Sequence, residues 1–279
     1  MQVETGGVTY IGAFLTFRCR FGCKYCINKF GSLTNRKQEL SAKEWVTGLN
    51  RLNINRDDKV PVTLQGGEPS QKEGWLDIIN GLNPGFYIDL LTNLDFDVEE
   101  FMRKVPPHRL QRDVPYASIR VSHHPKSGDV VQTMAEMQRR GYSVGLFAVE
   151  HPKIDIAGIR ARAQAWGIDF RTKEFLGIYK KKLYGDYKYP EAINSKTLKK
   201  VKCKSNELLI APDGFIHRCH RDLYMGVNPA GHLLDDDLKI EFKFRDCDAF
   251  GSCNPCDQKI KTDRFQNKGA CAVEIEFPN

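Results

Sequence analysis

The chain has 279 residues with a formal net charge of +7; 28% of the residues are charged and 41% are hydrophobic. This composition fits one large globular domain, or one domain with a smaller second one, and no apolar run comes near the roughly 18 residues that a membrane-spanning helix needs. The first residues, MQVETGGVTYIG, lack the basic region and apolar core of a signal peptide. We therefore expect a cytoplasmic protein with no membrane partner. Its nine cysteines are then expected to be thiols or metal ligands rather than disulfides.

Strand-like apolar runs alternate with amphipathic stretches over the first 175 residues. The runs lie at 9–16, 60–65, 86–92, 116–122, 142–149 and 168–175. Helical spacing is found at 41–52, where Ser41 and Glu44 form a capping box, and at 127–140 and 154–166. Six strand–helix units predict an α/β fold with a parallel sheet, a partial (βα)6 barrel, with chemistry at the carboxyl ends of the strands.

The pattern changes after residue 176. Residues 177–202 are rich in lysine and tyrosine with little periodicity, which predicts a linker. Residues 203–279 carry six of the nine cysteines and only short secondary-structure signals. We therefore predict a barrel domain at 1–176 and a small C-terminal iron–sulfur domain at 203–279, held together by metal more than by a hydrophobic core.

Three cysteines directly follow the first predicted strand, in the stretch CRFGCKYC. Three thiolates can hold three irons of a four-iron cluster and leave the fourth iron open to bind a small molecule, although a fragment of a zinc site is an alternative. The spacing of Cys19, Cys23 and Cys26, with Tyr25 before the last cysteine, resembles the signature of the radical S-adenosylmethionine (SAM) superfamily.

A second motif, LQGGEPS, ends the second predicted strand and resembles the Gly-Gly-Glu-Pro motif of the same superfamily. Gly66 and Gly67 would let the backbone approach a ligand closely. Glu68, before Pro69, would receive the methionine ammonium of SAM. Taken alone, the motif is also explained as an ordinary turn before a helix. Together with the cysteines, it extends the resemblance over roughly residues 9–175.

Further contacts to SAM follow from the resemblance. On the fourth strand, alternation places Ser118 on the same face as two other polar residues of that strand, and this set would meet the ribose and carboxylate of SAM. The fifth-strand segment VGLFAVE resembles the part of the superfamily whose backbone meets the adenine. The residues implied are Thr92, Asn93, Arg120, Ser122 and Phe147. The implied cofactors are SAM and a [4Fe-4S] cluster, and the implied partner is an electron donor such as flavodoxin or ferredoxin.

A second cysteine set begins at Cys203. Ten residues separate Cys203 from Gly214, and four separate Gly214 from Cys219. A hairpin turn is predicted at Asp213 and Gly214. This spacing resembles the start of the auxiliary-cluster domains called SPASM and twitch. In the twitch assignment, which we prefer, one [4Fe-4S] cluster is held by Cys203, Cys219, Cys253 and Cys256. In an incomplete SPASM domain, Cys247 and Cys271 join them and two clusters are shared. Structural zinc is a third alternative.

The resemblance implies that SAM is cleaved to a 5′-deoxyadenosyl radical, which takes a hydrogen atom from a substrate. Oxidation then needs an electron acceptor, such as the auxiliary cluster, and a base. Epimerisation needs a cysteine S–H that returns a hydrogen atom. We narrowly favour oxidation. Base candidates at strand ends are His123, His124, Glu150, His151 and Glu174, and the candidate hydrogen donor is Cys247.

The substrate class is inferred from size. Short twitch enzymes are similar to enzymes that oxidise or epimerise sugars and aminocyclitols, so we expect a small carbohydrate or aminocyclitol-type substrate. Only 18 residues precede Cys19, so we do not expect an N-terminal leader-binding domain, and modification of a ribosomally made peptide is the alternative. A zinc-bound nucleic-acid module would explain the cysteines and the charge without explaining Gly-Gly-Glu-Pro, so nucleic acid is not an expected partner.

Overall fold

The computed structural model describes residues 2–23, 25–26, 38–55, 57, 59–111, 116–175, 177–184, 199–250 and 273–277, and the structural statements below concern these residues. Cys253, Cys256 and Cys271 lie outside them. None of the helices in the described ranges combines the length and the apolar character needed to cross a bilayer.

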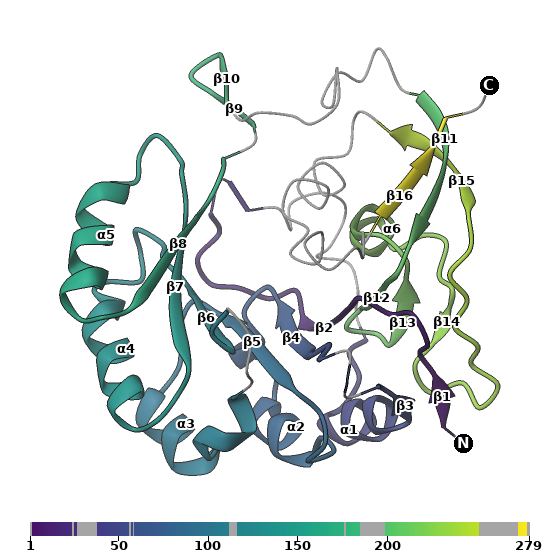
Figure 1. Cartoon of the computed structure of the whole chain (residues 1–279), viewed down its shortest axis with the longest axis horizontal. Helices are drawn as coiled ribbons and strands as arrows, with labels where there is room; N and C mark the ends of the chain where they lie inside the picture. Colours follow the sequence, from purple (N-terminus) through teal and green to yellow (C-terminus); the bar gives the residue numbers. More distant parts are fainter. Residues whose placement is uncertain are drawn as a thin grey trace.

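The predicted strands form the centre of one large sheet (Figure 1). They are β2 (Tyr10–Thr16), β4 (Val62–Gly66), β5 (Ile88–Thr92), β6 (Ile119–Ser122), β7 (Val144–Val149) and β8 (Asp169–Lys173). Each strand lies parallel to the next in this order. The parallel sheet predicted from the strand–helix repeat is therefore confirmed, within a mixed α/β architecture.

Helices connect the strands and lie along one side of the curved sheet (Figure 1). They are α1 (Ala42–Asn50), α2 (Trp75–Gly81), α3 (Val98–Lys104), α4 (Val130–Arg139) and α5 (Ile156–Ala165), with 3-10 turns η4 (Pro69–Gln71) and η5 (Pro107–Leu110). The capping box of Ser41 and Glu44 is formed. Alternate strand residues join Trp45 and Phe101 in one buried core, and full burial of such side chains contributes about 1.5–3 kcal/mol each.

The large sheet continues into the C-terminal part of the chain. β12 (Glu207–Ile210) lies parallel to β2, and β13 (Phe215–His217) and β14 (Gly231–His232) follow as antiparallel neighbours. The predicted turn at Asp213 and Gly214 joins β12 to β13, and Gly214 has a φ of +85°. Hydrogen bonds of this sheet therefore cross the predicted domain boundary at residue 203.

A smaller antiparallel sheet stands beside the end of the large one. It consists of β15 (Arg245–Phe250), β11 (Lys199–Ser205) and β16 (Val273–Glu276), in that order. Helix α6 (His220–Met225) begins directly after Cys219, which is its N-cap residue. Two short strands of the N-terminal part, β1 (Val3–Glu4) and β3 (Leu52–Asn53), pair parallel with each other.

The segment predicted as a linker contains a β-hairpin. β9 (Gly177–Tyr179) and β10 (Lys182–Tyr184) pair antiparallel. Lys180 and Lys181 connect them with φ values of 49° and 64°, the left-handed conformation that two-residue hairpin turns need. Such turns usually contain glycine or asparagine, so the two lysines gave no signal for a hairpin.

Candidate functional site at the carboxyl edge of the sheet

The carboxyl ends of the parallel strands carry the residues that the sequence singled out. The cysteine loop follows β2, the Gly-Gly-Glu-Pro segment ends β4, and Asn93 follows β5. The histidine and glutamate candidates follow β6, β7 and β8. Because these strands are parallel neighbours, their ends lie along one edge of the sheet.

The two glycines of Gly-Gly-Glu-Pro pack against the start of the cysteine loop. Gly67 N–H donates to the Thr16 carbonyl at 2.7 Å, and Glu68 N–H donates to the Arg18 carbonyl at 2.8 Å. A Cβ atom at Gly66 would lie 2.1 Å from the Thr16 oxygen, and one at Gly67 would lie 2.2 Å from the Arg18 oxygen. Glycine is therefore required at both positions by the close approach to the protein's own backbone, and the approach to a ligand stays a prediction.

Glu68 is buried at the centre of this edge, with 1% of its surface exposed. Its carboxylate accepts hydrogen bonds from Thr92 Oγ1 at 2.7 Å, from Asn93 N at 2.7 Å and from Ser70 N at 3.3 Å. Burial raises the pKa of Glu68, although these hydrogen bonds act to lower it. Thr92 and Asn93, which were predicted to bind SAM, thus hold the Glu68 carboxylate in this structure.

Asn93 also reaches the cysteine loop. Its Nδ2 donates to the sulfur of Cys19 at 3.7 Å, while its backbone N–H binds Glu68. Arg20, the residue after Cys19, forms an ion pair of 2.7 Å with Asp95 near the end of β5. The first cysteine is therefore attached to the Gly-Gly-Glu-Pro segment and to the end of β5 by polar contacts.

His124 packs inside the cysteine loop. Its Nδ1 lies 3.1 Å from the sulfur of Cys23 and 3.0 Å from the hydroxyl of Tyr25, and the Tyr25 and His124 rings are stacked with an interplanar angle of 13°. Burial lowers the pKa of His124 to about 4, so this imidazole is neutral at pH 7. The neighbouring candidate His123 also has its pKa lowered by burial.

Cys19 is exposed, whereas Cys23 and Cys26 are half-buried. Burial raises the pKa of the Cys23 thiol, and the nearby Cys26 and Cys19 raise it further. In the described ranges, no three His, Cys, Asp or Glu side chains converge on a point that would hold a metal ion. The donor set nevertheless fits an iron–sulfur cluster chemically, because three thiols share one loop and an amide N–H of Asn93 faces one of the sulfurs.

The alternation predicted on the fourth strand is present in β6. Ile119 and Val121 are fully buried in the core, while Arg120 and Ser122 are partly exposed on the other face. Arg120 Nη2 lies 2.8 Å from Oδ2 of Asp89, whose side chain is fully buried. Arg120 is therefore held in place by a carboxylate of β5, a partner that the sequence pattern did not indicate.

The catalytic candidates after β6, β7 and β8 differ in their surroundings. His123 is half-buried, and its backbone N–H donates to the Phe147 carbonyl at 2.7 Å, whereas Glu150 and Glu174 are exposed. His151 is buried, and its ring centroid lies 5.2 Å from that of Tyr25. It also contacts Phe175 and Tyr179, at 4.7 Å and 4.9 Å between ring centroids. The β9–β10 hairpin is thus linked to the cysteine loop through His151.

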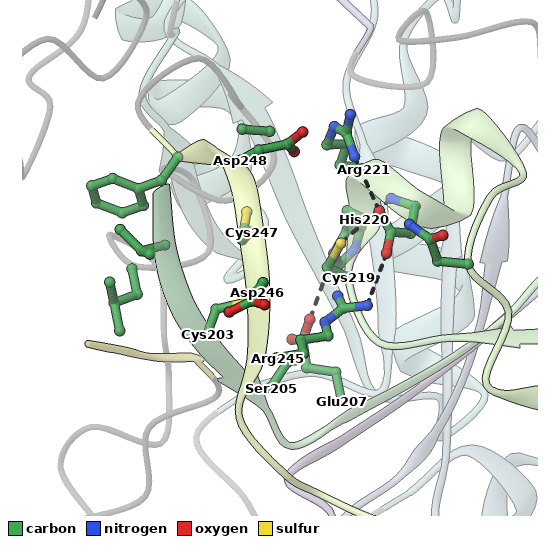
Figure 2. A pocket seen from close by; sticks show the side chains of 16 residues that line it. Cys203, Ser205, Glu207, Cys219, His220, Arg221, Arg245, Asp246, Cys247 and Asp248 are labelled. Carbon is green, nitrogen blue, oxygen red and sulfur yellow. Dashed lines mark hydrogen bonds and ion pairs between the residues drawn. The ribbon is translucent and has the colours of Figure 1, made fainter. Parts of the chain in front are cut away.

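A second site lies between the small sheet and helix α6. Cys203 of β11, Cys219 before α6 and Cys247 of β15 line one pocket of about 320 Å³ (Figure 2). Cys203 and Cys247 lie on paired strands of the small sheet, and the interaction between their side chains raises the pKa of Cys203 and lowers that of Cys247. The preferred assignment had left Cys247 as a spare thiol near the auxiliary cluster, and the SPASM alternative had made it a ligand together with Cys203.

Buried polar groups close one side of this pocket. His220 Nδ1 lies 3.6 Å from Oε2 of Glu207, and both side chains are largely buried. Burial lowers the pKa of His220 to about 4. His217, the other histidine beside Cys219, is also buried and its Nδ1 lies 3.0 Å from the Val227 carbonyl oxygen.

No family model matches the chain, and no curated protein matches it. Among solved structures, the chain is similar to BtrN in complex with AdoMet and 2-DOIA. The similarity has a TM-score of 0.40 and 13% sequence identity, and it covers 81% of this chain and 78% of that one. A resemblance of this size supports no functional argument.

Proposed function

We propose that the chain is a radical SAM enzyme that takes a hydrogen atom from a small substrate. The observation that carries the proposal is the pair of contacts made by Asn93, which binds Glu68 through its backbone and Cys19 through its side chain. Two motifs that lie far apart in the sequence, CRFGCKYC and Gly-Gly-Glu-Pro, therefore belong to one polar network at the carboxyl edge of the sheet.

When bound, a [4Fe-4S] cluster with SAM on its open iron supplies the electron that cleaves the sulfonium C–S bond. Cys19, Cys23 and Cys26 would hold the cluster. Glu68 would bind the SAM ammonium, with its carboxylate held in place by donors of Thr92, Asn93 and Ser70. A cationic ligand would also offset the cost of keeping this carboxylate charged in a buried position.

We propose oxidation as the reaction type, with a carbohydrate or aminocyclitol-type substrate and an external electron donor such as flavodoxin or ferredoxin. Cys203 and Cys219, with Cys253 and Cys256 from outside the described residues, would hold an auxiliary cluster that accepts an electron. Cys247 lines the same pocket as Cys203 and Cys219. Epimerisation would need Cys247 as a hydrogen donor, whereas oxidation needs the auxiliary cluster as electron acceptor and no role for Cys247.

Iron and sulfide analysis after anaerobic reconstitution tests the proposal. The wild type should hold about eight irons per chain. Replacing Cys19, Cys23 and Cys26 by Ala should leave about four irons and abolish SAM cleavage. The reciprocal control, Cys203→Ala with Cys219→Ala, should lose the other four or so but still cleave SAM. Zinc without sulfide in the wild type, or SAM cleavage by the triple variant, would contradict the proposal.

A further inference from the structure

An arginine side chain lies among the cysteines of the second pocket. Arg245 is the cross-strand partner of Cys203 in the pairing of β15 with β11, and both side chains line the pocket. Figure 2 shows it between Cys203 and the start of α6, with a dashed line to the carboxylate of Asp222. Burying a cation is costly unless it is paired, so the partners of this guanidinium decide what its charge can do.

The position of this guanidinium is fixed by Asp222. Arg245 Nη1 lies 2.8 Å from Oδ2 of Asp222, and only 5% of the Asp222 side chain is exposed. Asp222 belongs to the first turn of α6, and its own N–H donates to the Cys219 sulfur at 3.4 Å. One carboxylate therefore locates Arg245 relative to two of the three cysteines, Cys203 and Cys219.

The charge of Arg245 matters for any metal centre at this site. Arginine stays charged in proteins, and the Asp222 carboxylate 2.8 Å away pairs with this guanidinium. Reduction adds a negative charge to a thiolate-bound iron–sulfur centre, and hydrogen bonds to its sulfurs and nearby positive charges favour the reduced form. An N–H donor carrying a positive charge contributes both effects.

We infer that Arg245 sets the reduction potential of the auxiliary centre, by donating an N–H to the Cys203 sulfur from a position fixed by Asp222. This inference rests on the proposed function, since it requires an iron–sulfur centre at Cys203 and Cys219. Arg245 acts here as a positioning residue: it touches a ligand of the centre, and it raises the potential at which the centre takes up an electron.

The test is a potentiometric titration with dithionite, followed by electron paramagnetic resonance. It uses the full chain with Cys19, Cys23 and Cys26 replaced by Ala, so that only the second centre contributes to the signal. Arg245→Gln should keep the iron content and lower the potential. A tenfold change in the reduction equilibrium corresponds to about 59 mV for a one-electron couple. Lys243→Gln removes the same charge from a side chain that is 68% exposed and outside the pocket, and it should leave the potential unchanged.

Two more variants separate charge from structural damage. Asp222→Asn removes a negative charge and should raise the potential, the opposite sign to Arg245→Gln. Arg245→Lys keeps the charge without the planar fork and should lower the potential less than Arg245→Gln. If Arg245→Gln loses its iron, the potential of Arg245→Lys decides whether Arg245 sets the reduction potential. Unchanged potentials in the iron-loaded arginine variants would overturn the inference and leave the proposed function standing. If the chain with Cys19, Cys23 and Cys26 replaced by Ala binds no iron and sulfide, the proposal of an auxiliary centre is itself overturned.

Discussion

Replacing Glu68 by Gln separates its two possible duties, which are closing the turn between β4 and β5 and binding a cationic ligand. The substitution keeps the shape of the side chain and removes its charge. The introduced amide oxygen can still accept from the Asn93 N–H, and the amide nitrogen can face Thr92, whose hydroxyl can turn to accept. Burial raises the pKa of Glu68 in spite of the hydrogen bonds from Asn93, Thr92 and Ser70, so the charged carboxylate is kept at a cost in stability.

The apoprotein should therefore be as stable with Glu68→Gln as without it, or more stable. A folded-state pKa above the ordinary value of 4.5 means that the folded wild type binds more protons than the unfolded chain in that range. Its stability consequently falls as the pH rises through the raised pKa. The variant lacks this loss, so its stability relative to wild type should grow as the pH rises above 4.5.

SAM binding should respond in the opposite way. A hydrogen bond between charged groups contributes about 1.5–3 kcal/mol, and about 1.4 kcal/mol corresponds to a tenfold change in affinity. Glu68→Gln should then weaken SAM binding by roughly 10- to 100-fold, measured by equilibrium dialysis on reconstituted protein with its iron intact. Glu73→Gln, at an exposed position of the same segment, is the matched control. Unchanged affinity in a variant that retains its cluster would refute the reasoning and leave Glu68 as a turn residue.

Two further predictions address the packing of the loop and the reaction type. Gly67→Ala should destabilise the fold by about 1–3 kcal/mol in urea unfolding, because its Cβ would meet the Arg18 carbonyl at 2.2 Å. Gly6→Ala, where no atom lies within 4 Å of the added Cβ, should change little, and equal effects would refute the packing argument. In deuterated water, an oxidised product should carry no solvent deuterium at the carbon that lost its hydrogen. Deuterium at that carbon would establish epimerisation instead.

The parallel sheet was predictable because its signal is local. Each of the six strands is a short apolar run. The alternation of buried Ile119 and Val121 with partly exposed Arg120 can be recognised from consecutive residues alone. The partner of β12 was not predictable in this way. Glu207 pairs with Tyr10, across nearly the whole chain, and no pattern within Glu207–Ile210 identifies β2 as its neighbour.

The sequence predicts which residues belong to the candidate site better than it predicts the contacts between them. Two adjacent histidines follow β6, and only packing against Tyr25 decides that His124 lies at the cysteine loop. The position of Cys247 has a similar cause. It depends on the register of β15 against β11, which pairs Cys247 with Val201 and Arg245 with Cys203 and contains an irregularity. Spacing between cysteines carries no information about such a register.

The two cysteine sets are connected by packed side chains as well as by the chain itself. Phe14 near the end of β2 contacts Tyr224 of α6, with ring centroids 6.1 Å apart, and Phe17 contacts the same ring at 6.2 Å. Cys19 lies two residues beyond Phe17, and Cys219 is the N-cap of α6. Phe14, Leu223 and Tyr224 belong to one buried cluster, and close-packed interiors resist relative movement of the elements they join. The separation of Cys19 and Cys219 is therefore fixed by this packing. On the proposed function, a substrate that gave a hydrogen atom at the first site and an electron at the second would meet Cys19 and Cys219 at a constant separation.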